Sequence, residues 1–142
     1  MRVLGLLTLL WVGMAQASSE VIEVFRDPYC GSCTEWIEHL KESGFEVKDH
    51  VTPNMDQVKK WAGVPPELAS CHTGIVQGKF IEGHVPAADI AKLLNSPLAG
   101  LAVPGMPVGS PGMEMGDRYD AYDVVGVNAQ GQQKVITHYP AR

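Results

Sequence analysis

The spacing of apolar residues divides the chain into alternating strand-like and helix-like segments. Residues 21–25 are β-branched and aromatic, which predicts a strand. Residues 33–43 repeat apolar side chains at helical spacing, and Gly44 follows as a stop signal. Residues 45–51 alternate apolar and polar side chains, as a half-buried strand does. The chain therefore begins in the order β-α-β.

A second helix is predicted to begin after Asn54, which would cap it with Gln57 as the partner of a capping box. Gly63 would end this helix. Four residues at helical spacing would form its inner face: Met55, Val58, Trp61 and Ala62. A hairpin follows, with strands at 74–77 and 80–85 around a turn at Gly78-Lys79.

Pro86 suits the first turn of a third helix, and Ile90, Leu93 and Leu94 would be its core face. The series β-α-β-α-β-β-α, with a C-x-x-C pair after the first strand, predicts an α/β fold of the thioredoxin-like plan. Right-handed crossovers would place the first strand between its neighbours in the sheet. The loop entering the third strand would then return beside the start of the first helix.

Residues 100–116, which we call the flap, are rich in glycine, proline and methionine. Glycine and proline at this density argue against a helix or an inner strand. Several leucine, valine and methionine side chains argue against disorder, so we expect an ordered loop. Residues 122–127 and 134–139 then predict a second hairpin that closes the chain.

The first residues have the pattern of a secretory signal peptide. Arg2 supplies a positive charge, residues 3–12 are apolar and uncharged, and Ala15-Gln16-Ala17 matches a cleavage site. We expect a signal peptide at 1–17, a single domain at 18–142, a periplasmic location and no membrane span after signal removal. The net charge of −5, without a basic cluster, argues against nucleic acid as a partner.

Two of the three cysteines, Cys30 and Cys33, stand between the first predicted strand and helix. A helix N-terminus favours the thiolate over the thiol. The pair could be a structural disulfide, a redox couple or two metal ligands. The third cysteine, Cys71, lies where the third strand begins, and there it would attack or trap any mixed disulfide. This placement favours a metal pocket that contains all three sulfurs.

Three thiolates form a soft ligand set, which selects Cu(I), although three cysteines and one histidine would also satisfy Zn(II). Met106 and Met113 in the flap favour copper, because thioether is a good Cu(I) ligand and a poor zinc ligand. Each methionine could instead fill a gap in an irregular core. His72 and His84 are further candidate ligands, whereas His39 and His50 are expected at the surface.

Several motifs resemble the CopG-type family: the segments around Cys30 and Cys33, around Cys71-His72, around His84, and the whole flap. This family comprises small exported thioredoxin-like proteins associated with bacterial copper resistance and long classed as a domain of unknown function. The resemblance covers residues 21–139 and implies a copper site built on Cys30, Cys33 and Cys71. It also implies a role among copper-efflux components.

We therefore expect a periplasmic protein that sequesters or relays Cu(I) through three cysteines and so contributes to copper resistance; the sequence leaves open whether it also has a copper redox or thiol–disulfide activity. Storage, delivery and Cu(II)/Cu(I) conversion all remain open, and a small multinuclear Cu(I) cluster is a further hypothesis. One alternative is a thiol–disulfide oxidoreductase, with Cys30 as the attacking thiolate and Cys33 as the resolving one. A second is a protein-binding module in which the cysteines only stabilise the fold.

Overall fold

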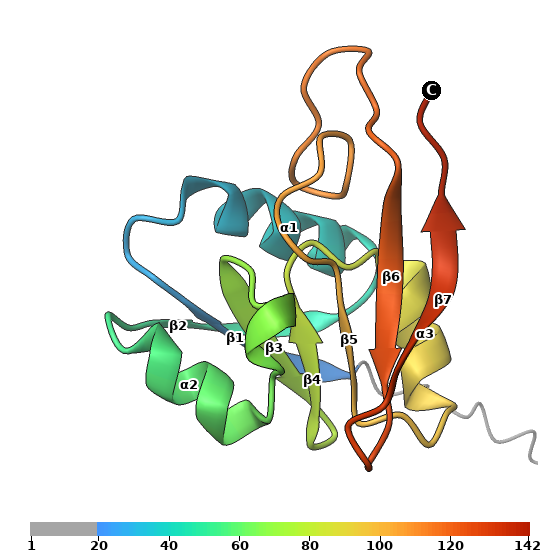
Figure 1. The fold of residues 1–142 in the computed structure, drawn as a ribbon. Coiled ribbons are helices and arrows are strands. Elements are labelled where there is room, and N and C mark those ends of the chain that lie inside the picture. Colours follow the sequence, from blue (N-terminus) through green and yellow to red (C-terminus); the bar gives the residue numbers. More distant parts are fainter. Residues whose placement is uncertain (1–19) are drawn as a thin grey trace, which may run out of the picture.

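The computed structural model describes residues 20–142, and the signal peptide predicted at 1–17 lies outside this range. Seven strands form one mixed sheet in the order β2-β1-β3-β4-β5-β6-β7, accompanied by three α-helices (Figure 1). The strands are β1 (Val21–Arg26), β2 (Glu46–Val51), β3 (His72–Val76), β4 (Lys79–Glu82), β5 (Gly100–Ala102), β6 (Tyr122–Val127) and β7 (Gln133–Tyr139). The helices are α1 (Gly31–Glu42), α2 (Met55–Ala62) and α3 (Ala87–Leu94), with a short 3-10 turn at Pro66–Leu68.

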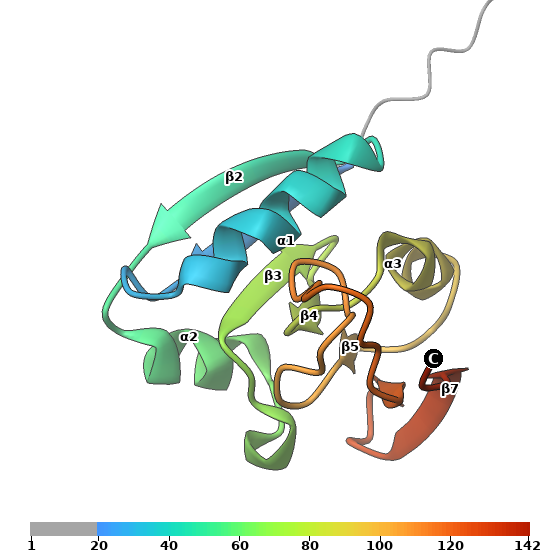
Figure 2. The same ribbon diagram turned by 90° about the horizontal axis from the view of Figure 1, so that it is seen from above.

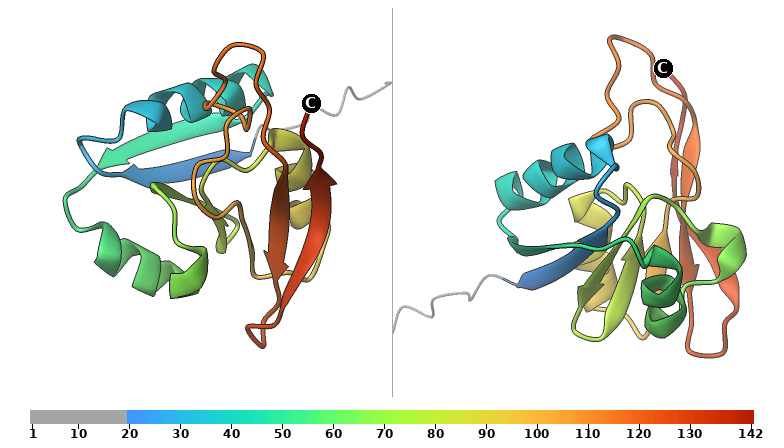
Figure 3. Two further views of the ribbon diagram at one scale, coloured as in Figure 1. Left: turned by 45° about the horizontal axis from the view of Figure 1, so that its top comes forward. Right: turned by 90° about the vertical axis from the view of Figure 1, so that its left-hand side faces the viewer.

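Strand β1 lies between β2 and β3, as the crossover argument predicts. It runs parallel to β2 and antiparallel to β3. Helices α1 and α2 lie on opposite sides of this part of the sheet (Figure 3). The two faces alternate along β4: Ile81 joins a core cluster with Trp36 and Leu40 of α1, whereas Phe80 joins a second cluster with Leu68. The central strands β3, β4 and β5 are therefore buried on both faces of the sheet, whereas the outer strands β2 and β7 are largely exposed.

The prediction that the flap contains no inner strand is wrong. Its first three residues form β5, which pairs in parallel with β4 and antiparallel with β6. These residues precede Pro104, so every one of them has a backbone N–H to donate. Gly100 is required here, because a Cβ atom would lie 2.4 Å from the Phe80 ring. Close packing against Phe80, rather than a loop, explains this glycine.

Helix α2 differs from its predicted packing. Met55 is buried, but Trp61 is 72% exposed, and its ring lies in an edge-to-face arrangement with the Phe25 ring, with centroids 6.3 Å apart. Asn54 occupies the N-cap position without a side-chain capping bond, so the predicted capping box does not form. Gly63 ends the helix with left-handed backbone, as expected. The face of α2 that packs against the sheet is therefore narrower than the spacing of its apolar residues predicted.

The first hairpin turns one residue earlier than predicted. Gln77 and Gly78 both have positive φ, 49° and 72°, so β4 begins at Lys79 and ends at Glu82. Paired positive φ values give the backbone twist that suits a tight hairpin. His84 therefore lies beyond the strand, in the loop that leads to α3. The C-terminal β6–β7 hairpin forms as predicted, with an irregularity between Val124 and Val125.

His39, expected at the surface, is half-buried. Its Nε2 atom accepts a hydrogen bond from the backbone N–H of Ala87 at 3.0 Å, which ties α1 to the start of α3.

Seen from above, the flap lies between α1 and the β6–β7 hairpin (Figure 2). Among residues 20–142, no helix has the length and apolar character needed to cross a membrane.

Candidate metal centre

Cys30 occupies the N-cap position of α1, and Cys33 lies in the first turn of that helix. The preceding turn is held by Asp27, whose backbone oxygen accepts from the N–H of Cys30 at 3.1 Å and whose side chain accepts from the N–H of Tyr29 at 2.8 Å. The two cysteines form a disulfide, with Cys30 half-buried and Cys33 fully buried. The helix start therefore presents the sulfur pair at the end of β1.

Cys71 converges on this pair from a distant part of the chain. It precedes β3, whose first residue, His72, is opposite Arg26 at the end of β1. The sulfur atoms of Cys30, Cys33 and Cys71 and a ring nitrogen of His72 all lie within 4.8 Å of one another. Cys71 is a free thiol. The topology thus brings the three cysteines together, while their binding of a metal stays a prediction.

The His72 ring presents an unprotonated nitrogen to the sulfurs. Its Nε2 atom lies 2.7 Å from the carbonyl oxygen of Gly83, which can only accept, so Nε2 carries the proton. Nδ1 is then a lone-pair acceptor in the neutral ring, 3.2 Å from Sγ of Cys33 and 3.2 Å from Sγ of Cys71. This is the orientation in which an imidazole binds a metal ion.

His84 is oriented in the same manner by the flap. Its Nδ1 atom donates to the carbonyl oxygen of Pro111 at 2.7 Å, and its Nε2 atom lies 3.4 Å from Sγ of Cys71. Histidine ligands of metals commonly donate their other ring N–H to a carbonyl or carboxylate in this way. Cys71 is therefore flanked by two imidazole lone pairs, each fixed by a backbone oxygen.

Burial keeps these groups in their neutral forms. It lowers the pKa of His72 well below the ordinary histidine value, and the nearby His84 ring lowers it further. Burial also lowers the pKa of His84, although the bond to Pro111 opposes this effect. It raises the pKa of the Cys71 thiol, against an opposing hydrogen bond from Ser70. Neutral imidazoles can bind a cation directly, and a soft metal would displace the thiol proton.

Trp36 forms the inner wall of the centre. Its ring stacks on the His72 ring with centroids 4.2 Å apart, and its indole N–H donates to the carbonyl oxygen of Val85 at 2.9 Å. The tryptophan is fully buried. It therefore excludes water from the side of His72 that faces the core.

The flap closes over the centre at Gly112. This residue has φ +86°, and a Cβ atom would lie 2.7 Å from the backbone nitrogen of Trp36 and 3.1 Å from Nδ1 of His84. The tight turn around it is held by a bond from the N–H of Gly109 to the carbonyl oxygen of Met113 at 2.8 Å. Glycine at 112 thus allows the flap to approach α1 closely enough for Pro111 to reach His84.

A groove of about 610 Å³ opens from the centre to the surface. Cys30, Cys71, Met106 and Met113 line it, with Tyr29 at its rim. Met106 is 44% exposed and Met113 is half-buried, so both thioethers stand at the opening, whereas Cys33, His72 and His84 are fully buried. The structure therefore assembles all seven residues predicted from the sequence around one centre and its entrance.

Three contributors were not identified from the sequence: the carbonyl groups of Gly83 and Pro111, and the ring of Trp36. Backbone carbonyls carry no residue-type signal, so their roles could not be recognised without the fold. Trp36 is one of the apolar residues at helical spacing in 33–43 and lies in the core, but its stacking on His72 depends on the pairing of β1 with β3. Glu114, an exposed flap residue, accepts from the N–H of Gly112 at 2.9 Å.

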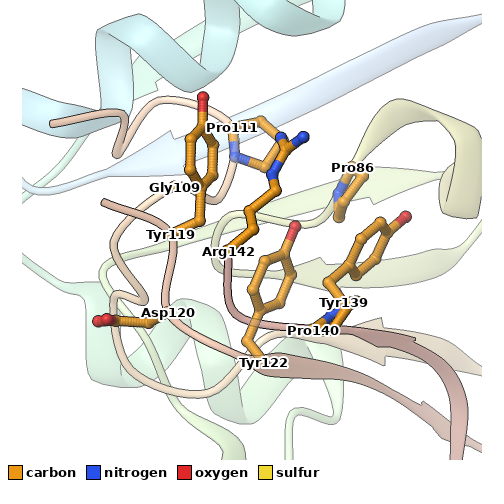
Figure 4. Close-up of a pocket in the computed structure, with 9 residues that line it drawn as sticks. All are labelled: Pro86, Gly109, Pro111, Tyr119, Asp120, Tyr122, Tyr139, Pro140 and Arg142. Carbon is orange, nitrogen blue, oxygen red and sulfur yellow. The ribbon is translucent and has the colours of Figure 1, made fainter. Parts of the chain in front are cut away.

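A second cavity, of about 400 Å³, has a different character (Figure 4). Tyr122 and Tyr139 stack at one side of it, and the Arg142 guanidinium lies 4.0 Å above the centre of the Tyr119 ring. Burial raises the pKa of Tyr122 to about 12. Its lining residues, all within 86–142, include no cysteine, histidine or methionine, so this cavity is not a candidate for a soft metal.

Residues 68–113 match the model of a protein family of unknown function, DUF411. This stretch contains Cys71, His72, His84 and the two groove methionines. The chain is also similar to two solved structures of a copper resistance protein, copG. The form 2 structure is 57% identical, with a TM-score of 0.85 over 87% of this chain and 100% of that chain. The form 1 structure is 58% identical, with a TM-score of 0.84 over 87% and 99%. No curated protein matches the chain.

The lowered histidine pKa values predict an acid-sensitive fold. Below pH 6.5, the ordinary pKa of histidine, the unfolded chain binds protons that the folded, metal-free protein does not bind. The free energy of unfolding therefore decreases as the pH is lowered. The loss begins near pH 6.5 and levels off once the pH passes the lowered pKa values of His72, His84 and His39. Urea unfolding at several pH values tests this. His72→Gln should flatten the dependence and His50→Gln, at the surface, should not; identical curves for both would contradict the prediction.

Substitution of Gly112 by alanine should destabilise the protein by about 1–3 kcal/mol, because strained backbone and a close contact combine there. Gly116→Ala is the matched control, since Gly116 also has positive φ (+62°) but has no atom within 4 Å of the Cβ position. Both variants carry the cost of left-handed backbone, and Gly112→Ala alone adds the collision with Trp36. If the two variants lose the same free energy of unfolding in urea, the flap does not depend on the close contact between Gly112 and α1.

Proposed function

The chain belongs to the CopG-type family of copper resistance proteins, and from this premise we propose that it sequesters or relays Cu(I) through Cys30, Cys33 and Cys71. The observation that carries the proposal is the convergence of these sulfurs with His72 within 4.8 Å. Thiolate and thioether sulfur are the ligands that select Cu(I). The copper ion is the cargo of this site, which its residues capture and release.

The three cysteines can act together only when the disulfide between Cys30 and Cys33 is reduced. Reduction frees two thiols, and the N-cap position of Cys30 favours its ionisation, because the positive end of a helix dipole stabilises a thiolate. In the disulfide form, Cys71 and the lone pairs of His72 and His84 remain as donors. We therefore expect the reduced protein to be the form with high affinity for Cu(I).

The groove supplies the route for the ion. Met106 and Met113 stand at its opening beside Cys30 and Cys71, so Cu(I) would meet thioether sulfur before it reaches the buried ligands. This placement supports copper over zinc, since thioether is a poor ligand for zinc. His72, His84, Met106 and Met113 are therefore proposed to complete the coordination that the thiolates begin.

Two broader features of the proposal concern fold and location. The strand order β2-β1-β3-β4, with β1 parallel to β2 and antiparallel to β3, supports the thioredoxin-like plan for residues 21–94. The pattern at residues 1–17 supports export to the periplasm. Membership of the copper resistance family supports copper-efflux components as partners. Detection of the mature chain in a periplasmic extract tests the location.

A thiol–disulfide oxidoreductase is the second candidate, and the disulfide at the start of α1 favours it. In that function, Cys30 would attack a substrate disulfide and Cys33 would resolve the mixed disulfide. Cys71, within 4.8 Å of both sulfurs, would compete with the substrate for them. An insulin-reduction assay separates the candidates: we expect slow turnover, and rapid turnover that persists in Cys71→Ser would favour the enzyme.

Loss of a cysteine should weaken Cu(I) binding far more than loss of a flap methionine. Removal of groups that merely orient metal ligands costs about 10–100-fold in affinity, so Cys30→Ser or Cys71→Ser should cost about 100-fold or more. Met113→Leu should cost less, because thiolate bonds to Cu(I) are stronger than thioether bonds. Competition against a Cu(I) chelator, without air and with a reductant, measures both.

The unaltered chain with the Cys30–Cys33 disulfide intact is the control for the oxidation state of these two cysteines. It should release Cu(I) to the chelator at lower chelator concentration than the reduced form. Equal affinity for the cysteine and methionine variants would defeat the three-cysteine site, and so would an unaltered chain that fails to retain Cu(I) under reducing conditions.

A further inference from the structure

Glu82, the last residue of β4, is a fully buried carboxylate outside the group formed by Cys30, Cys33, Cys71 and His72. It accepts three hydrogen bonds. The backbone N–H of Ser70 donates to Oε2 at 2.8 Å, and the ammonium group of Lys59 donates to the same oxygen at 2.5 Å. The hydroxyl of Thr73 donates to Oε1 at 2.5 Å. Charged, short hydrogen bonds of this kind are the stronger ones in proteins.

The residues held by Glu82 bracket two of the proposed ligands. Ser70 precedes Cys71, and Thr73 follows His72, so one carboxylate fixes both ends of the Cys71-His72 segment. The next residue along the chain, Gly83, accepts from Nε2 of His72, and the one after it is His84. Residues 82–84 therefore position Cys71 and His72 and also carry His84.

Close packing makes this arrangement specific. Gly83 has φ +78°, and a Cβ atom there would lie 2.9 Å from the Ser70 side chain and 2.5 Å from the carbonyl oxygen of Val103. The Ser70 hydroxyl in turn donates to the carbonyl oxygen of Gly105 in the flap at 2.7 Å. The segment that carries Cys71 is thus held from β4 on one side and from the flap on the other.

We propose that Glu82 and Lys59 form a positioning pair that holds Cys71 and His72 at the distance a metal ion requires. The effect on copper rests on the proposed function, whereas the effect on the position of Cys71 does not. Lys59 comes from α2, on the opposite side of the sheet from α1, and its side chain is 14% exposed. It compensates the buried carboxylate and also donates to the Thr73 hydroxyl at 3.1 Å.

Removal of one member of a buried ion pair leaves an uncompensated charge, which can destabilise the whole fold. The test therefore uses two variants. Glu82→Gln keeps the shape of the side chain but replaces one acceptor oxygen with an amide group. The double variant Lys59→Met, Glu82→Gln removes both charges together, so no charge is left alone in the core. Circular dichroism establishes at which temperature each variant is folded, and the binding measurements are made there.

Asp89 offers a matched control within the same protein. It is also a fully buried carboxylate, it accepts from the hydroxyl groups of Thr137 at 2.5 Å and Tyr139 at 2.6 Å, and Lys92 lies 3.5 Å away. These partners lie on α3 and β7, outside the groove. Asp89→Asn should therefore lower stability as Glu82→Gln does, without displacing Cys71.

Two measurements decide the proposal. In Cu(I) competition under reductant, both Glu82 variants should lose about 10–100-fold in affinity, as expected for outer groups that orient metal ligands, and Asp89→Asn should stay within about twofold of the unaltered chain. In the metal-free disulfide form, iodoacetamide should alkylate Cys71 several-fold faster in the Glu82 variants only. The Glu82 carboxylate raises the pKa of Cys71 and the Lys59 ammonium lowers it, so the double variant, which removes both charges, decides whether faster alkylation reports the position of Cys71 rather than its ionisation. This measurement needs no copper, so it stands even if the proposed function fails. Unchanged rates and affinities in folded Glu82 variants, or equal changes in Asp89→Asn, would overturn the positioning role.

Discussion

The pairing of β1 with β3 is the contact on which the rest of the structure depends. Arg26, at the end of β1, is opposite His72, at the start of β3, so the turn that leads to Cys30 and the loop that carries Cys71 leave the sheet at the same edge. A shift of this register by one residue would turn His72 to the other face of the sheet. The buried alternation of Ile22 and Val24 against α1 opposes such a shift.

Backbone carbonyl groups, rather than side chains, fix the orientation of the two imidazoles in the centre. Carbonyl oxygens of Gly83 and Pro111 hold the protons of His72 and His84 away from the sulfurs, and so leave both lone pairs directed towards Cys71. The flap reaches His84 only because Gly112 lacks a side chain. Throughout residues 20–142, no buried polar side-chain atom is left without a hydrogen-bond partner. The donors of the centre are therefore ordered before any ion arrives.

The same sulfurs serve two opposed states. As a disulfide, Cys30 and Cys33 do not offer thiolates, and Cys71 with two imidazoles forms the remaining donor set. As thiols, all three cysteines would supply the soft ligands that Cu(I) prefers. The proposed capture of copper is thus linked to the redox state of the pair. Glu82 and Lys59 hold the third sulfur in place in the structure described here, where the pair is oxidised.

Periodicity and motif spacing were sufficient for much of this protein. They predicted the order of the first seven elements, the position of β1 inside the sheet and the convergence of Cys71 with Cys30 and Cys33, because strands, helices and their connections follow local and topological rules. Periodicity and motif spacing gave wrong predictions where tertiary packing determines whether a residue is buried or lies in a strand. Trp61 has the spacing of a core residue but lies outside the narrow contact of α2, and Gly100 has the composition of a loop but completes an inner strand against Phe80. The tautomers of His72 and His84, the wall formed by Trp36 and the anchoring by Glu82 depended on tertiary structure alone, because each arises from atoms that only the folded chain brings together.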